Sequence, residues 1–182
     1  SPNRRVLFNL LKALYHECPV RIDIAGTVES IAEITPELLY GCYRSFYNLH
    51  NMVLVVAGNV DTDTVLRVAD RVLIPAPEWN LERAATAEPI QAATSRVEVD
   101  MPVAAPLFYY GYKCPVQGTA YRPAAELAAA DVLLELLAGK SSPLYARLLR
   151  KGLINTSFGC QYFEGPGYAS WLFGGESRDP DA

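Results

Sequence analysis

The sequence predicts an α+β fold, in which helices pack on antiparallel strands. Three observations support this class. Segments with helical and with extended patterns both recur along the chain. The second half has the order strand, strand, helix, helix, strand, strand. Its last two strands are separated only by a Gly-Pro-Gly turn at 165–167, which is typical of an antiparallel hairpin rather than a parallel sheet.

Three helices and one strand are expected in the first 74 residues. Apolar residues recur at helical spacing over 4–16, 36–47 and 62–73, so each segment has one face to bury. Thr35, followed by proline, is a strong start signal for the second helix. Residues 51–58, NMVLVVAG, form a nearly continuous apolar run that predicts a strand buried on both faces.

Residues 75–95 differ from the segments around them. They contain three prolines, several alanines and no clear periodicity, which is typical of a linker. We therefore expect residues 1–74 to be the C-terminal part of one α+β domain and residues 96–182 to be the N-terminal part of a second.

The second part begins with two predicted strands. SRVEVDM, residues 95–101, alternates apolar and polar side chains, and APLFYYGYK, residues 105–113, is rich in aromatic residues. Helices follow over 121–139 and 143–152, each ended by a glycine. The hairpin then closes the chain, so the expected core lies between these helices and the strands.

Composition and charge exclude several classes of protein. The chain has 182 residues, of which 51% are hydrophobic and 20% charged, as in a globular protein. The net charge of −4 argues against a nucleic-acid partner, because a phosphate backbone needs a basic face. No apolar run approaches the roughly 18 residues of a membrane span, so no membrane partner is expected. The chain starts without methionine and stops just after a strand-like run, and we expect it to be part of a longer protein.

The four cysteines do not suggest a metal knot or a disulfide framework. They lie in four separate segments, and no two have C-x-x-C spacing: Cys18, Cys42, Cys114 and Cys160. Reduced cysteines in or near the core are the expected state, which favours a reducing compartment.

The stretch YHECPV, residues 15–20, is the strongest candidate for chemistry, because it places histidine, glutamate and cysteine side by side. A zinc hydrolase motif fails here. Both HExxH and HxxEH starting at His16 need a histidine at position 20, which is Val20. Cys18 and His16 are two residues apart and do not share a helix face, so a cysteine–histidine nucleophile is not indicated. Because Pro19 disfavours helix before it, we interpret the stretch as a helix end and its turn.

Other motifs are incomplete. GKSSP, residues 139–143, would need a glycine at position 134 to form a phosphate loop, and that residue is Leu134. Asp61 and Asp63 lack the glycine and distal glutamate of a calcium loop and are expected to cap a helix.

One charged cluster and one aromatic run remain. The basic cluster lies on the 143–152 helix and is expected to be a solvated face, with contact to a peptide or partner as the alternative: Arg147, Arg150 and Lys151. The aromatic residues at 108–112 alternate faces of a strand and are expected in the core.

The order of these segments resembles a known family. A helix ending in YHECP precedes GTVESI, then a helix with spaced aromatics, then NMVLVVAGNVD and a further helix. Downstream, AADVLLELLAGKSSPLYARLLRKGLI follows. This arrangement is similar to the M16 (insulinase/pitrilysin-like) zinc metallopeptidases, in their YmfH-like bacterial subgroup and in the region called the C-terminal or "inactive" domain. The resemblance covers about residues 3–178.

The resemblance implies a partial fold of the LuxS/MPP-like metallohydrolase type. It also implies that the parent enzyme binds zinc through HxxEH and a glutamate, all upstream of this chain. No catalytic, cofactor-binding or metal residue can therefore be assigned here. The family's arginine–tyrosine substrate pair belongs to the distant half. Residues 150–158 are topologically similar but carry Phe158 and no matching tyrosine, so that role is not assigned either.

Two functions follow from the resemblance. The first is a non-catalytic segment of an M16-like zinc metallopeptidase that forms chamber wall and packs against the other domains, with a peptide as the parent's substrate. The alternative is part of a catalytically inactive homologue that assembles with an active M16 subunit. A small-molecule binding module is a third, weaker interpretation. Without HxxEH the chain alone is expected to be inactive, and a cytoplasmic location is expected.

Overall fold

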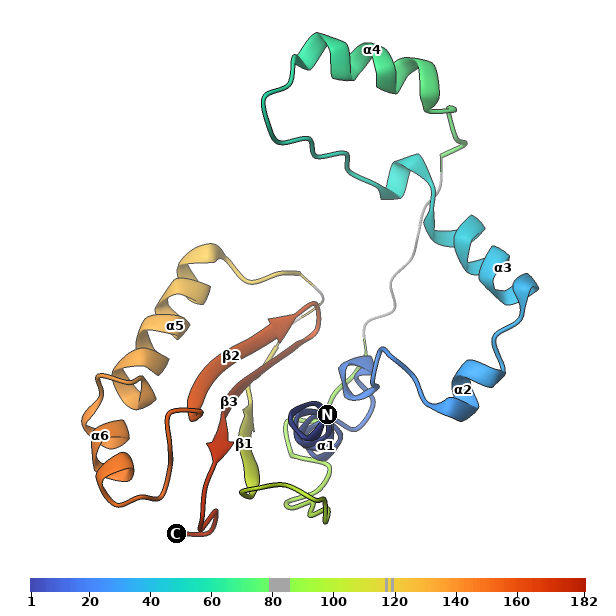
Figure 1. Cartoon of the computed structure of the whole chain (residues 1–182). Coiled ribbons are helices and arrows are strands. Elements are labelled where there is room, and N and C mark those ends of the chain that lie inside the picture. The colour runs from blue at the N-terminus through green and yellow to red at the C-terminus, as the bar shows by residue number, and fades with distance from the viewer. Residues whose placement is uncertain (79–85, 117, 119) are drawn as a thin grey trace. The chain divides into compact units, whose positions relative to one another are not determined.

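The computed structural model describes residues 1–78, 86–116, 118 and 120–182 (Figure 1). The described residues divide into two units. The first comprises residues 1–25 and 86–182, and the second residues 26–78. These units group the chain differently from the expected domains at 1–74 and 96–182, since residues 1–25 pack with the C-terminal half. The boundary between family domains stays a prediction, and residues 79–85 of the expected linker lie outside the described residues.

A three-stranded antiparallel sheet forms the centre of the first unit. Its strands are β1 (Leu107–Lys113), β2 (Gly159–Gly165) and β3 (Tyr168–Glu176), in the order β1-β3-β2. The β2–β3 hairpin is confirmed, and Gly167 provides the positive φ of 82° that its tight turn requires.

One helix, α1 (Pro2–Leu14), covers one face of this sheet. Leu11 and Leu14 pack with Leu172 of β3 in a cluster that also holds Tyr15 and Cys18. Gly111 of β1 makes the close approach possible. A Cβ at this position would lie 2.6 Å from Cδ1 of Leu14.

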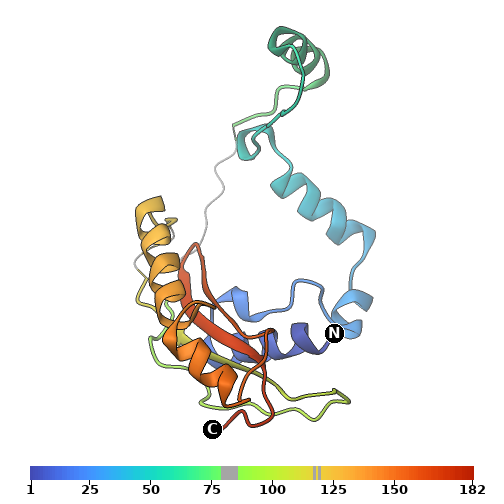
Figure 2. The same ribbon diagram turned by 60° about the vertical axis from the view of Figure 1, so that its left-hand side comes forward.

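Two helices, α5 (Ala124–Ala138) and α6 (Pro143–Arg150), cover the opposite face (Figures 1 and 2). Their core cluster joins Ala138 and Tyr145 to Ile154 and Phe158, with Phe108 of β1 packed against it. Side chains at alternate positions of the strands therefore enter two different cores. The first unit is a helix–sheet–helix arrangement, and the α+β class is confirmed.

The second unit contains α2 (Val28–Ala32), α3 (Pro36–Phe46) and α4 (Thr62–Val72). Short 3₁₀ turns lie at Leu49–Asn51 in this unit and at Pro19–Arg21 in the first unit. Thr35 caps α3 as predicted, because its hydroxyl oxygen accepts a hydrogen bond from the Leu38 N–H at 3.2 Å.

Two predicted strands are wrong. Residues 51–58 and 95–101 have no strand structure. A strand is stabilised by a neighbouring strand, and no pairing partner for either segment exists within the described ranges. Val53 and Val55 are accordingly 88% and 80% exposed. None of the described helices combines the length and the apolar character needed to cross a membrane.

Candidate functional site

The YHECPV turn follows α1, as predicted. The helix ends at Leu14, and three consecutive residues of the turn, 16–18, have backbone N–H groups that bond to a side chain. All three donate to the carboxylate of Glu88: His16 at 2.7 Å, Glu17 at 2.8 Å and Cys18 at 2.8 Å. This one side chain thereby fixes the turn from 70 to 72 residues away in sequence.

Glu88 also forms a buried ion pair with Lys113 at the end of β1. The distance between Oε1 and Nζ is 2.7 Å, and the two side chains are only 7% and 4% exposed. Lys113 donates in addition to the carbonyl oxygens of Pro89 and Gln91, so its three N–H groups all have acceptors. The ammonium group lies 5.1 Å from the ring centre of Tyr15, a cation–π distance.

Tyr15 continues this polar cluster into the core. Its hydroxyl and that of Ser170 on β3 are 2.5 Å apart, and the two residues are 1% and 0% exposed. Burial raises the pKa of Tyr15, although the hydrogen bond to Ser170 opposes the change. Tyr15, Ser170, Lys113 and Glu88 thus join α1, β3, β1 and residues 86–92 through satisfied polar contacts.

The pKa of Glu88 reflects these contacts. Burial alone would raise it, but the hydrogen bond from Lys113 and those from the His16, Glu17 and Cys18 N–H groups outweigh burial. The pKa falls from 4.5 to about 2. The carboxylate is therefore held ionised as a structural acceptor, and it is unsuited to take up a proton near neutral pH.

This shift predicts a loss of stability in acid. A carboxylate whose pKa is lower in the folded state stabilises the fold at pH values above its pKa in the unfolded state, which is near 4.5. That stabilisation disappears as the pH falls toward 2. We expect Glu88 to contribute about 2–3 kcal/mol, from about 1.4 kcal/mol per pKa unit. Urea unfolding of the wild type and of Glu88→Gln between pH 6 and about 2.5 would measure it. Other carboxylates titrate in both proteins, so the difference isolates Glu88. Parallel pH profiles would contradict the assignment.

The turn does not form a metal centre in this structure. No group of three histidine, cysteine, aspartate or glutamate side chains that could hold a metal ion occurs in the described part of the chain. Cys18 is 5% exposed and packs in the α1 core. His50 lies in the other unit, where a ring nitrogen is 3.0 Å from the Ala76 carbonyl oxygen.

The remaining candidate residues act as helix caps or lie at the surface. Asp61 accepts hydrogen bonds from the Thr64 N–H at 2.8 Å and the Thr64 hydroxyl at 2.6 Å, and these bonds lower its pKa. Ser142 of GKSSP accepts from the Tyr145 N–H at 3.1 Å and caps α6. The basic cluster is exposed at the end of α6: Arg147, Arg150 and Lys151.

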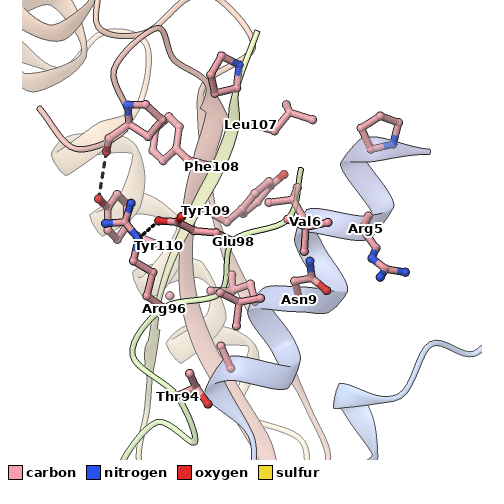
Figure 3. Close-up of a pocket in the computed structure, with 18 of the residues that line it drawn as sticks. Arg5, Val6, Asn9, Thr94, Arg96, Glu98, Leu107, Phe108, Tyr109 and Tyr110 are labelled. Atoms are coloured by element: carbon pink, nitrogen blue, oxygen red, sulfur yellow. Dashed lines mark hydrogen bonds and ion pairs between the residues drawn. The ribbon is translucent and has the colours of Figure 1, made fainter. Parts of the chain in front are cut away.

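A cavity of about 680 Å³ lies between α1, residues 92–103 and β1 (Figure 3). Tyr109 of β1 and Val6 of α1 point toward one another across it. Arg96 forms ion pairs with Glu98 and with Asp181, the latter at 2.8 Å, on the side away from α1. The lining residues come from α1, from residues 92–103, from residues 106–111 and from residues 180–181.

Sequence analysis missed both Glu88 and this cavity. Glu88 lies in the proline- and alanine-rich stretch predicted to be a linker, where no local pattern marks a buried carboxylate. The only available signal was the isolated lysine at the end of an aromatic strand. A buried lysine needs an acidic partner, but the sequence does not say which.

The geometry defines an α+β segment, with helices on both faces of an antiparallel sheet and a turn whose backbone N–H groups bind the Glu88 carboxylate. Comparison with known proteins is more specific. The family model "Peptidase M16 inactive domain" matches residues 33–181. The chain therefore belongs to the M16 peptidase family, as its motif order indicated.

Two relatives support this assignment. The uncharacterized zinc protease YmfH of Bacillus subtilis (strain 168) is 34% identical over 190 residues, covering 100% of this chain and 43% of the relative. A crystal structure of an M16-like peptidase from Alicyclobacillus acidocaldarius superposes with a TM-score of 0.87 at 37% identity. That match covers 99% of this chain and 43% of the other. The chain thus spans less than half the length of these relatives.

Proposed function

We propose that this chain is a non-catalytic segment of an M16-like zinc metallopeptidase, in which it forms chamber wall and packs against the other domains of the parent. The name of the B. subtilis relative, a zinc protease, supports zinc-dependent peptide-bond hydrolysis in the parent. In that proposal a peptide is the substrate, and zinc is held by residues outside this chain.

The observation that best supports a packing role is the absence of a core among the described residues of the second unit. None of the residues 26–78 is buried. A hollow of about 580 Å³ lies between residues 54–60 and α4, lined mainly by valine and leucine, including Val56, Val68 and Val72. On α3, Leu39, Tyr43 and Phe46 are more than half exposed. An apolar surface of this kind is normally covered by further polypeptide.

Helix α5 of the first unit supports the same role. Its inner face is buried through Ala130, Leu134 and Ala138. Its outer face is also apolar and is 45–69% exposed: Val132, Leu133, Leu136 and Leu137. Helices that are apolar all round are normally buried, so we expect another element of the parent to cover this face.

Zinc content and peptide cleavage test the proposal. We expect the parent to hold about one zinc ion per chain, the content of a mononuclear hydrolase site, and to cleave a quenched unstructured peptide. Residues 1–182 alone should bind no stoichiometric zinc and show no cleavage. Elemental analysis and fluorescence assays on both proteins give the two readouts. Stoichiometric zinc on residues 1–182 would contradict the proposal.

A metal-free and inert parent would instead favour the inactive-homologue alternative. In that case, adding an active M16 subunit should restore cleavage. We also propose a cytoplasmic location, which the four free cysteines support because they fit a reducing compartment.

A further inference from the structure

The turn after α1 and the end of β1 together surround one carboxylate, that of Glu88. Its Oε1 accepts from the His16 N–H and from Nζ of Lys113, each at 2.7 Å. Its Oε2 accepts from the Glu17 and Cys18 N–H groups, each at 2.8 Å. An ionised carboxylate has two oxygens with about four lone-pair sites in all. The donors of the turn and of Lys113 therefore match a carboxylate, with two donors to each oxygen.

These donors are held by contacts that do not involve the carboxylate. Before the turn, the buried side chain of Tyr15 is hydrogen-bonded to Ser170. After the turn, the Arg21 guanidinium donates to the His16 carbonyl oxygen. Lys113 lies opposite Ser170 in the β1–β3 ladder. We therefore expect the donors to keep their places when the carboxylate is absent.

The carboxylate belongs to residues 86–92, called the strap below, which have few other attachments. No backbone–backbone hydrogen bond joins the strap to another described residue. Its residues are exposed apart from Glu88, and Ile90 is 49% exposed. Lys113 also binds the carbonyl oxygens of Pro89 and Gln91. These two carbonyl contacts offset only part of the entropy lost on ordering the strap, so its attachment depends on the carboxylate.

We propose that residues 16–18 and Lys113 form a binding site for a short-chain carboxylate, and that Glu88 occupies this site as a releasable anchor for the strap. When the Glu88 side chain is withdrawn, an external carboxylate such as acetate takes its place. The strap is then no longer held against the turn and β1.

The geometry favours a carboxylate over a tetrahedral anion. Sulfate or phosphate would bring further oxygens, whereas the donors are already distributed over two. The Lys113 and Glu88 side chains are only 4% and 7% exposed, so additional oxygens would be buried without donors, which costs free energy. Acetate, in contrast, reproduces the end of the glutamate side chain.

Amide hydrogen exchange in Glu88→Ala tests the site. We expect the His16, Glu17 and Cys18 amides to exchange at least about 10-fold faster in this variant in sodium chloride than in the wild type. Sodium acetate at about 200 mM and the same ionic strength should restore slow exchange at all three. It should also raise the melting temperature of the variant by at least about 3 °C more than that of the wild type. Failure of acetate to protect the three amides would overturn the proposal.

Two controls separate a carboxylate site from a general salt effect. Sodium sulfate at equal ionic strength should leave the three amides unprotected, and protection equal to that in acetate would overturn the proposal. In Glu88→Ala/Lys113→Met the ammonium is also missing, so acetate should protect the turn at least about 10-fold less. Equal protection in the two variants would contradict the proposed site. If Glu88→Ala is unfolded in chloride, acetate should restore its near-UV circular dichroism, and failure to do so would also overturn the proposal.

Backbone order parameters from the same NMR samples test the release of the strap. At Ile90 and Gln91 we expect values near about 0.85 in the wild type and below about 0.6 in Glu88→Ala. Acetate should leave these low values unchanged, because it fills the site without being joined to the strap. The Thr94 N–H is the internal reference, since it bonds to the Ala13 carbonyl at 2.9 Å and should stay protected throughout. A strap that remains ordered in Glu88→Ala would overturn the anchoring role of Glu88.

Discussion

Replacing Lys113 with methionine should destabilise residues 1–182 by about 3–5 kcal/mol, because the substitution leaves the Glu88 carboxylate buried without its counter-ion. Methionine keeps most of the volume of the lysine stem, so lost packing contributes little. The carboxylate would keep its three backbone N–H donors but lose the ammonium group at 2.7 Å. Urea unfolding followed by Trp171 fluorescence, in a Trp79→Phe background, would measure the change.

A double-mutant cycle separates the ion pair from its surroundings. Glu88→Gln with Lys113→Met removes both charges, and the side chain at 88 keeps an acceptor for the turn. We expect the double variant to be more stable than Lys113→Met alone by about 1–3 kcal/mol, because the uncompensated buried charge is gone. If the double variant is less stable than the wild type by the sum of the two single losses, the two side chains do not interact, and the buried-pair assignment fails.

The sequence predicted the helices well because their signals are local. The Thr35 cap, the Asp61 cap and the helical spacing of apolar residues each depend on neighbours within one or two turns. The hairpin was also predictable, because its two strands are joined by a short turn that contains Gly167.

The two wrong strands show the limit of local patterns. Residues 51–58 and 95–101 have the composition of strands, but a strand is formed by pairing, and no described residue pairs with them. The valines at 53 and 55 remain exposed for that reason. Their apolar pattern is suited to a buried strand, which supports the proposal that further polypeptide packs against this chain.

The Glu88–Lys113 contact was unpredictable for a related reason. It joins a residue in a stretch without periodicity to the last residue of β1, and the turn it holds follows α1. Residues 86–92 had the composition of a linker, yet they anchor a buried cluster. Sequence analysis placed YHECPV at a helix end, but it could not identify the acceptor that the turn requires.

The second large effect is expected at Gly175 of β3. A Cβ there would lie 2.6 Å from the Cα and 2.8 Å from the N of Phe158. These are backbone atoms, so no side-chain rotation relieves the clash. The loop cannot easily withdraw, because the Ser157 hydroxyl accepts a hydrogen bond from the Glu176 N–H at 2.9 Å and the Phe158 ring is buried against Tyr145.

Gly175→Ala should therefore lower the free energy of unfolding by about 2–4 kcal/mol, as expected when a close-packed contact is overfilled. Gly159→Ala is the matched control, since Gly159 lies in the neighbouring strand β2, where an added Cβ would meet no atom within 4 Å. We expect that variant to stay within about 0.5 kcal/mol of the wild type, because alanine also costs less conformational entropy than glycine in a strand. Equal effects at the two positions would mean that the Phe158 loop yields, and that the α5–α6 face of the sheet is less rigid than its buried aromatic cluster implies.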